Sequence, residues 1–166
     1  TFEGFSSEAA ASLVEISADS PRSGSLSLDI SIAGDVDSFA GVFQDISVAG
    51  LEGTPVLYSG YHQLVGDAGG SEYRIEWRNE ATNTEISRTQ LTAGPSDGGG
   101  YELFTLNDSV PVGADIARVV YNIQTFGPGA NQNVFVDDVT FDVVPEPSGV
   151  ALLGVSALGL IARRRR

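Results

Sequence analysis

A charged run in the middle of the sequence offers the clearest binding chemistry. Arg74, Glu76 and Arg78 alternate with apolar side chains, so a β-strand would carry all three on one face. Guanidinium groups beside a carboxylate can bind pairs of hydroxyl groups on a ligand. The same groups can instead form a cross-strand ladder of ion pairs with neighbours such as Glu85 and Arg88. The pattern therefore predicts either a ligand-binding face or a structural ladder.

The aromatic and histidine residues near this run are further candidates. Trp77, the single tryptophan, shares its phase with Tyr73 and Ile75, and a large aromatic side chain in an apolar phase is typical of a core. Tyr61 and His62 precede the run, and we expect them to extend the polar face if a ligand binds there. Otherwise His62, the only histidine, is interpreted as a surface or strand-end residue.

The composition argues against an enzyme. The chain has no cysteine and one histidine, so metal sites built from these two residue types are excluded. Its one Gly-x-Ser-x-Gly match, GPSDG at residues 94–98, lies in a glycine-rich turn with no helical pattern after it, so it does not form the strand-to-helix elbow of a nucleophilic serine. Its 22 acidic residues could hide a glycosidase pair, but carboxylates this common carry little information. We therefore predict a protein without catalytic activity.

Charge separates the last residues from the rest of the chain. Residues 1–145 hold 21 of the 22 acidic residues but 5 of the 9 basic ones, all of them arginine. Such a domain repels nucleic acid and anionic lipid, and the acidic residues are typical of a solvated surface. Because the sequence begins at Thr1 without an apolar leader, we expect that a signal peptide was removed or that the sequence is a fragment.

Period-two alternation predicts β-structure throughout residues 1–144. In residues 24–32 (GSLSLDISI), leucine and isoleucine alternate with serine and aspartate, which is typical of a half-buried strand. Glycine-rich turns separate the strands, so we predict one all-β domain, an antiparallel β-sandwich with jelly-roll topology. The predicted strands are Ala11–Ala18, Gly24–Ile32, Gly41–Val48, Pro55–Gln63, Ser71–Asn79, Thr84–Leu91, Tyr101–Leu106, Ala117–Thr125 and Asn133–Val143.

The end of the sequence follows a different pattern. A Pro-Glu-Pro ends the strand-rich region, 14 apolar and small residues follow from Gly149 to Ala162, and four arginines come last. As a helix the apolar run would span about 21 Å, which is short for a hydrocarbon core of roughly 30 Å. The pattern predicts one short transmembrane helix with its arginines on the cytoplasmic side. The flanking residues are Pro145, Glu146, Pro147, Arg163, Arg164, Arg165 and Arg166.

This order of features closely resembles the PEP-CTERM sorting signal of exported bacterial proteins, a tail that has also been labelled after an ice-binding protein. The resemblance implies an exosortase-type membrane protease as partner, with cleavage near the Pro-Glu-Pro. It also implies transient anchoring in the cytoplasmic membrane and a final place at the cell surface or in the extracellular matrix. We therefore divide the chain into a β-sandwich ectodomain, 1–144, and a sorting signal, 145–166. The sequence lacks the regular threonine ladder that would support ice binding.

Four short motifs resemble, in order, the carbohydrate-binding modules with a galactose-binding-like jelly roll. They are TFEGF at residues 1–5, GSLSL at 24–28, GVFQDI at 41–46 and VFVDDVTF at 134–141. The resemblance implies a domain that binds extracellular polysaccharide. It also implies a structural Ca²⁺ held by acids from the two ends of the domain, Glu3 and Asp137.

The position of Asp137 in its strand supports two interpretations. Alternation puts it in phase with Phe135 and Phe141, so we expect it to point inward and Asp138 to face solvent. A buried carboxylate without a partner is costly, and a hard cation would remove that cost. Alternatively, Asp137 accepts backbone N–H groups at a bulge, without metal.

The expected function follows from the tail and the ectodomain together. We expect an exported, non-enzymatic protein that associates with extracellular polysaccharide. The alternative is a structural or adhesive matrix protein whose sandwich has no sugar site.

Overall fold

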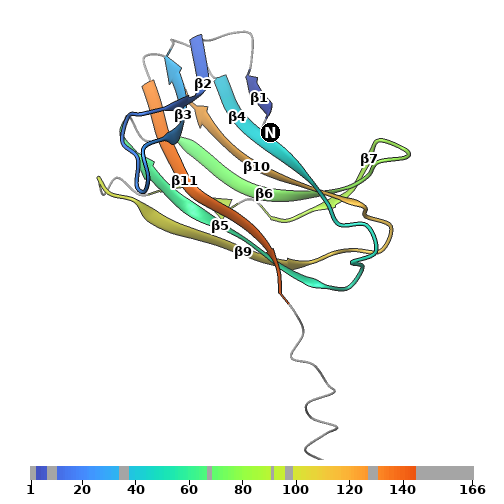
Figure 1. The fold of residues 1–166 in the computed structure, drawn as a ribbon. Helices are drawn as coiled ribbons and strands as arrows, with labels where there is room; N and C mark the ends of the chain where they lie inside the picture. Colours follow the sequence, from blue (N-terminus) through green and yellow to red (C-terminus); the bar gives the residue numbers. More distant parts are fainter. Residues whose placement is uncertain are drawn as a thin grey trace, which may run out of the picture.

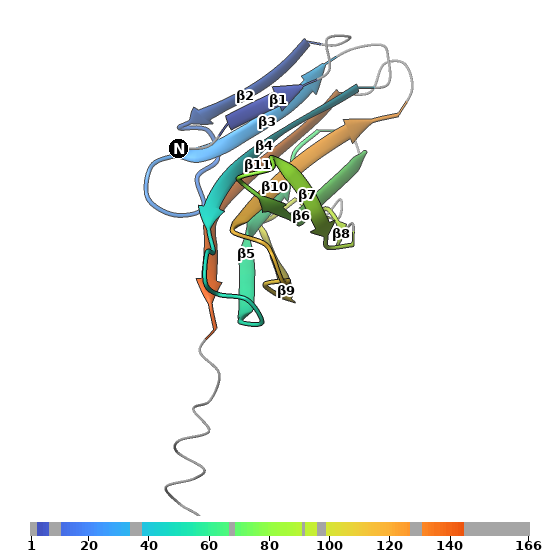
Figure 2. The same cartoon turned by 90° about the vertical axis from the view of Figure 1, so that its right-hand side faces the viewer.

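Two antiparallel β-sheets face each other in the computed structural model (Figures 1 and 2). The structure describes residues 3–6, 11–33, 38–66, 69–90, 92–95, 99–126 and 131–144. This architecture confirms the predicted all-β sandwich. The sorting residues and the C-terminal helix predicted within 145–166 lie outside the described residues. In the part of the chain that is described, no helix is long and apolar enough to cross a membrane.

Sheet A has the strand order β1-β4-β10-β6-β7, and the two-residue strand β8 also pairs with β6. All of its pairs are antiparallel. The long strands β4, β10 and β6 lie in the middle and align their residues over most of their length. The strands are β1 (Glu3–Ser6), β4 (Ser38–Ser47), β6 (Gly70–Asn79), β7 (Thr84–Arg88), β8 (Thr92–Ala93) and β10 (Ile116–Thr125).

Sheet B has the order β2-β3-β11-β5-β9, again with antiparallel neighbours only. The loop between β2 and β3 runs across the outer side of this sheet (Figure 1). Its strands are β2 (Ala11–Ser17), β3 (Ser27–Ala33), β5 (Pro55–Leu64), β9 (Glu102–Ser109) and β11 (Asn131–Val143).

Strand β6 shows how alternation builds the core between the sheets. Tyr73, Ile75 and Trp77 are 7%, 0% and 1% exposed, and the charged residues between them face outward. Trp77 donates its indole N–H to Oδ2 of Asp108 on β9, 2.8 Å away. The prediction that Trp77 belongs to the core is therefore confirmed. On the opposite sheet, β5 alternates in the same way and buries every second residue, including His62.

A β-bulge interrupts the pairing of β11 with β5. Asp137 lies opposite Tyr61, but Thr140 lies opposite Ser59, so β11 contains one extra residue between the two pairs. Asp138 takes a left-handed φ of 50° at this point. The extra residue reverses the alternation: Asp137 shares the outer face with Tyr61, whereas Phe141 lies opposite the buried Tyr58. The expectation that Asp137 points inward with Phe141 is therefore wrong.

Candidate functional site

The outer face of sheet A gathers four of the five arginines found in residues 1–145. The register places Glu76 of β6 opposite Arg118 of β10 and opposite Arg88 of β7. Arg74 and Arg78 share this face because alternate residues of a strand point the same way. We call this surface the arginine face. It comprises Arg74, Arg78, Arg88 and Arg118 together with the acids Asp45, Glu72, Glu76 and Glu85.

Glu76 occupies the centre of an ion-pair network on the arginine face. Its carboxylate accepts hydrogen bonds from Nε and Nη2 of Arg74 at 2.9 and 2.7 Å. Guanidinium nitrogens of Arg78 and Arg88 lie 3.6 and 3.9 Å from its oxygens. The side chain of Glu76 is only 9% exposed, so these cations offset the cost of removing its charge from water. The structural ladder considered from the sequence is therefore present.

A second ion pair joins β4 to β10 on the same face. Nε and Nη2 of Arg118 donate to the two carboxylate oxygens of Asp45 at 2.7 and 2.8 Å, which is bidentate geometry. This hydrogen bonding lowers the pKa of Asp45 and raises the pKa of Arg118. The guanidinium carbon of Arg118 also lies 3.9 Å from the ring centroid of Phe43. Both partners are therefore ionised at neutral pH and held in one orientation.

A polar hollow of about 160 Å³ opens at the end of the arginine face, where β4, β6 and β10 meet the turn between β6 and β7. Among the described residues of its lining, Ile116 is the one apolar residue. Its polar groups are two carboxylates, two guanidinium groups and two amides, so the hollow offers both hydrogen-bond donors and acceptors. They belong to Asp45 and Glu80, Arg78 and Arg118, and Asn79 and Asn83.

The turn that closes this hollow is fixed by its own hydrogen bonds. Oδ1 of Asn79 accepts from the backbone N–H of Thr82 at 3.0 Å, and Nδ2 of Asn79 donates to the carbonyl of Gly113 at 3.1 Å. The N–H of Glu80 donates to Oδ1 of Asp115 at 2.7 Å. Asn83 adopts a φ of 49°, a conformation that asparagine tolerates better than most residues. The hollow is therefore largely preformed, which lowers the entropic cost of binding a ligand.

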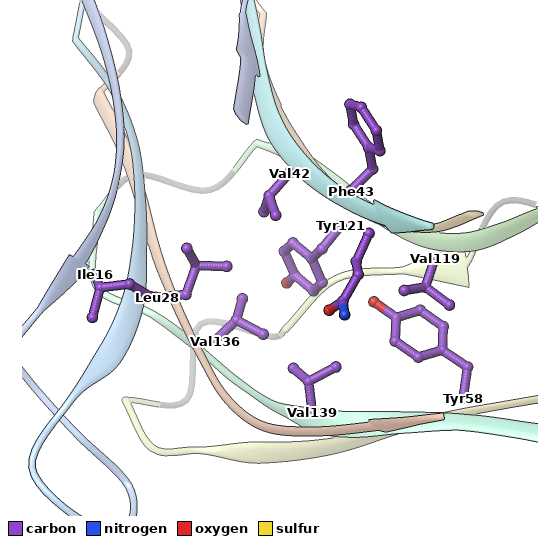
Figure 3. A pocket seen from close by; sticks show the side chains of 10 residues that line it. Ile16, Leu28, Val42, Phe43, Tyr58, Val119, Tyr121, Val136 and Val139 are labelled. Atoms are coloured by element: carbon purple, nitrogen blue, oxygen red, sulfur yellow. The ribbon is translucent and has the colours of Figure 1, made fainter. Parts of the chain in front are cut away.

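A second cavity among the described residues, of about 180 Å³, lies between the two sheets at the open edge beside β4 (Figure 3). Aliphatic side chains such as Leu28, Val136 and Val139 converge on it, whereas Phe43 points away from them (Figure 3). Its main polar groups come from Tyr58, Tyr121 and Gln44. This apolar lining offers few partners for a hydroxyl-rich ligand, so the cavity is a less suitable binding site than the polar hollow.

Tyr61 and His62 do not join the arginine face, because β5 belongs to sheet B. Tyr61 lies on the outer side of that sheet, with the guanidinium carbon of Arg22 3.4 Å from its ring centroid. His62 points into the core and is 3% exposed, so its interpretation as a surface or strand-end residue is wrong. Its Nδ1 lies 2.8 Å from the hydroxyl of Tyr121. Burial lowers the pKa of His62 to about 4.

The two residues expected to hold calcium are not brought together. Glu3 is exposed on β1 of sheet A, opposite Phe43, whereas Asp137 lies on sheet B. Asp137 accepts backbone N–H bonds from Arg22 at 2.8 Å, Ser23 at 3.1 Å and Asp138 at 2.7 Å. These contacts match the alternative of a metal-free bulge. Among the described residues, no three histidine or acidic side chains form a group that could hold a metal, and the calcium site stays a prediction.

Sequence reasoning placed Arg78 on the binding face but missed most of the hollow around it. Asp45 and Arg118 lie 73 positions apart in the chain, and only the strand order makes them neighbours. The turn residues Asn79 and Asn83 gave a local signal, since polar residues at a strand end are typical of a turn. That signal indicates where the chain reverses and says nothing about a ligand.

Comparison with known proteins identifies the end of the chain. Residues 143–166 match the family described as the PEP-CTERM protein-sorting motif. The chain therefore carries this sorting signal, and the signal indicates an exported protein. No curated protein matches the chain.

Solved structures resemble the sandwich. The enzymatically active domain of tailspike protein 4 from bacteriophage CBA120 superposes with a TM-score of 0.66 and 17% identity, covering 87% of this chain and 19% of that one. A carbohydrate-binding module from the β-sandwich superfamily superposes with a TM-score of 0.63 and 13% identity, covering 85% of this chain and 56% of that one. The CBM22-1 xylan-binding domain from Paenibacillus barcinonensis superposes with a TM-score of 0.60 and 17% identity, covering 86% of each chain. The chain thus spans less than two thirds of the first two proteins.

These likenesses establish the fold class. The sandwich is of the type found in carbohydrate-binding modules, as the sequence motifs implied. Identities of 13% to 17% carry no information about which ligand, if any, this chain binds.

Proposed function

We propose that this protein is exported and binds extracellular polysaccharide through the arginine face and its polar hollow, without catalysing a reaction. The observation that carries the proposal is the preformed hollow, in which carboxylate, guanidinium and amide groups from three strands and a turn converge. The solved structures that share the fold include a module described as xylan-binding, which supports a sugar as the ligand class. The sorting motif supports a place of action outside the cell.

The chemistry of the hollow suits sugar hydroxyls. Each hydroxyl donates one hydrogen bond and accepts others, so it can bridge a carboxylate and a guanidinium group side by side. Asp45 and Arg118 present such a pair in fixed geometry. Hydrogen bonds to charged groups are worth about 1.5–3 kcal/mol each. A few of them would give a weak but specific site for one or two sugar units.

The most direct test of this function is a glycan array probed with the full chain. We expect binding to a restricted set of polysaccharides. A wider screen by calorimetry against soluble plant, algal and bacterial polysaccharides covers glycans that the array lacks. Uniform absence of binding in both screens would contradict the proposal.

The second candidate function is a structural or adhesive matrix protein without a sugar site. One observation favours it: every arginine on the arginine face has an acidic partner within 4.0 Å, so the charges already satisfy one another. A folded chain that binds no glycan but associates with other matrix proteins would support this second function.

Processing of the tail belongs to the same proposal. An exosortase-type protease would cut near Pro145-Glu146-Pro147 and release the sandwich to the cell surface or matrix. The apolar run would anchor the chain in the cytoplasmic membrane until that step, with Arg163–Arg166 on the inner side.

A further inference from the structure

The outer face of sheet B contains a buried carboxylate with an oxygen that meets no hydrogen-bond donor. Asp29 of β3 is 7% exposed, although it lies on the face opposite the core. Its Oδ1 atom is inaccessible to solvent and lacks a hydrogen-bond partner. An unpaired buried carboxylate is strongly destabilising. Its surroundings should therefore either supply a cation or keep the group protonated.

The neighbours of Asp29 add negative charge. Glu15 of β2 lies directly opposite Asp29 in the antiparallel register, and directly opposed side chains on one face have Cβ atoms about 5 Å apart. Like charges at such a pair are destabilising. Burial first, and then the charges of Glu15 and Asp19, raise the pKa of Asp29. On its other side Asp29 faces Phe135, which brings no charge.

A second oxygen on this face also lacks a donor. Asn133 of β11 lies two residue pairs further along, opposite Ser31, and its Oδ1 is buried without a hydrogen-bond partner. Carboxylate and amide oxygens are the ligands that calcium takes in proteins. The β2–β3 loop nearby contains Arg22, but this arginine forms an ion pair with Asp138 and stacks on the ring of Tyr61.

The loop between β2 and β3 gives this region a fixed cover. Ser27 donates its hydroxyl to the carbonyl of Asp19 at 2.6 Å, and the Tyr101 hydroxyl donates to the carbonyl of Ser20 at 2.6 Å. The backbone of Arg22 and Ser23 is bound to Asp137. A small ion is therefore a better fit than a larger ligand at the Asp29 carboxylate.

We propose that Asp29 and Glu15 hold a divalent cation of the calcium type on the outer face of sheet B, with water completing its coordination. Asp19 adds attraction from the loop, and Asn133 supplies a further oxygen on the same face. This site shares no residue with the Glu3 and Asp137 pair that the family resemblance implied. It is independent of the proposed sugar site, because the arginine face lies on the other sheet.

The test compares thermal unfolding of the full chain in 10 mM CaCl₂ and in chelator. Sites of extracellular modules bind calcium with dissociation constants of about 10⁻⁴–10⁻³ M, so we expect the melting temperature to rise by about 5 °C in calcium. The Asp29→Asn variant should lose this rise. In chelator it should melt at or above the parent temperature, because the amide removes an uncompensated charge.

Two further variants locate the ion on the sheet. Glu15→Gln should weaken the calcium response while leaving the fold intact, since Glu15 is exposed on an edge strand. Asp142→Asn, an exposed acid on the same sheet, should keep the full response. Calorimetry should find one ion per chain in the parent and none in Asp29→Asn.

Three outcomes would overturn the proposal. The first is a parent chain whose melting temperature does not rise in calcium. This includes the case in which only acidification raises the melting temperature, because Asp29 binds a proton instead of an ion. The second is a calcium response that survives in Asp29→Asn. The third is a response that Asp137→Asn abolishes while Asp29→Asn and Glu15→Gln leave it unchanged, which would place the ion at the bulge.

Discussion

At the scale of single residues, His62 is a titratable group inside an aromatic cluster. The rings of Phe104, Tyr121 and Tyr73 have centroids 5.2, 5.7 and 5.9 Å from the imidazole. The Tyr121 hydroxyl provides a polar contact to the imidazole Nδ1, at 2.8 Å. Burial disfavours the charged imidazolium and lowers the pKa from 6.5 to about 4.

This pKa predicts a loss of stability in acid. Between pH 6.5 and about 4 the unfolded chain binds a proton at His62 and the folded chain does not, so stability falls as the pH is lowered through this window. The loss amounts to about 3 kcal/mol once the pH is below both values. In His62→Gln we expect a flatter dependence of the urea midpoint on pH between 7 and 4. An unchanged pH dependence in a folded His62→Gln would contradict this account.

Prediction of which side chains are buried succeeded where strand alternation determines the burial. It failed where residues distant in the sequence determine it. The phase of Trp77 identified it as a core residue, because strand geometry is local. The same argument gave the outward direction of Arg74, Glu76 and Arg78. It failed for His62, whose burial depends on aromatic rings contributed by three other strands.

At the scale of elements, the bulge of β11 and the β2–β3 loop form one unit. Asp137 binds two backbone N–H groups of the loop, and Asp138 accepts the Ser23 hydroxyl at 2.5 Å and pairs with Arg22. Serine hydrogen bonding and the arginine both lower the pKa of Asp138. The bulge therefore turns two consecutive acids toward a loop that lies more than a hundred residues earlier in the chain.

We expect Asp137→Ala to lower the free energy of unfolding by about 1–3 kcal/mol in chelator. The substitution leaves two loop N–H groups without their acceptor, and losing the acceptor of a buried or half-buried donor has this cost. Asp137→Asn, which keeps one acceptor oxygen, should lose less. Asp142→Ala on the same strand is the control. Equal urea midpoints for Asp137→Ala and Asp142→Ala would show that the bulge does not anchor the loop.

The elements predicted from the sequence are largely those observed, because long alternating strands carry their own signal. The strands missed are β1 and β8, which have four and two residues and too few positions to show a period. The bulge at Asp137 and Asp138 could not be predicted from the sequence either. A single inserted residue is recognised only when the partner strand and its register are known.

At the scale of the whole molecule, the strand order concentrates nearly all arginines of an acidic domain on one face. Glu76, Arg118 and Asp45 form one row across β6, β10 and β4, although their strands are far apart in the sequence. Sequence reasoning could count these charges but could not place them, because it does not determine which strands are neighbours. The candidate site was therefore predicted for one strand and missed for the others.

The C-terminal tail leads to a prediction about how the whole protein is processed and localised. Replacing Arg163–Arg166 by serine should weaken retention of the tail on the cytoplasmic side, because basic residues oppose translocation. Unprocessed or mislocalised protein should then accumulate. Intact mass of the surface-exposed protein measures the outcome. A parent protein that reaches the surface still ending in Arg166 would contradict cleavage near Pro145-Glu146-Pro147.

The central claim is that the arginine face binds a sugar, and affinity calorimetry with the best glycan from the array tests it most directly. Asn83→Gly removes an amide of the hollow while keeping its left-handed turn, and Arg74→Ala with Arg78→Ala removes two guanidinium groups. We expect Asn83→Gly to weaken binding about tenfold and the double variant to abolish it. Arg22→Ala, in the loop beside sheet B, should bind like the parent. Unchanged affinity in the folded Asn83→Gly and double variants would contradict the account.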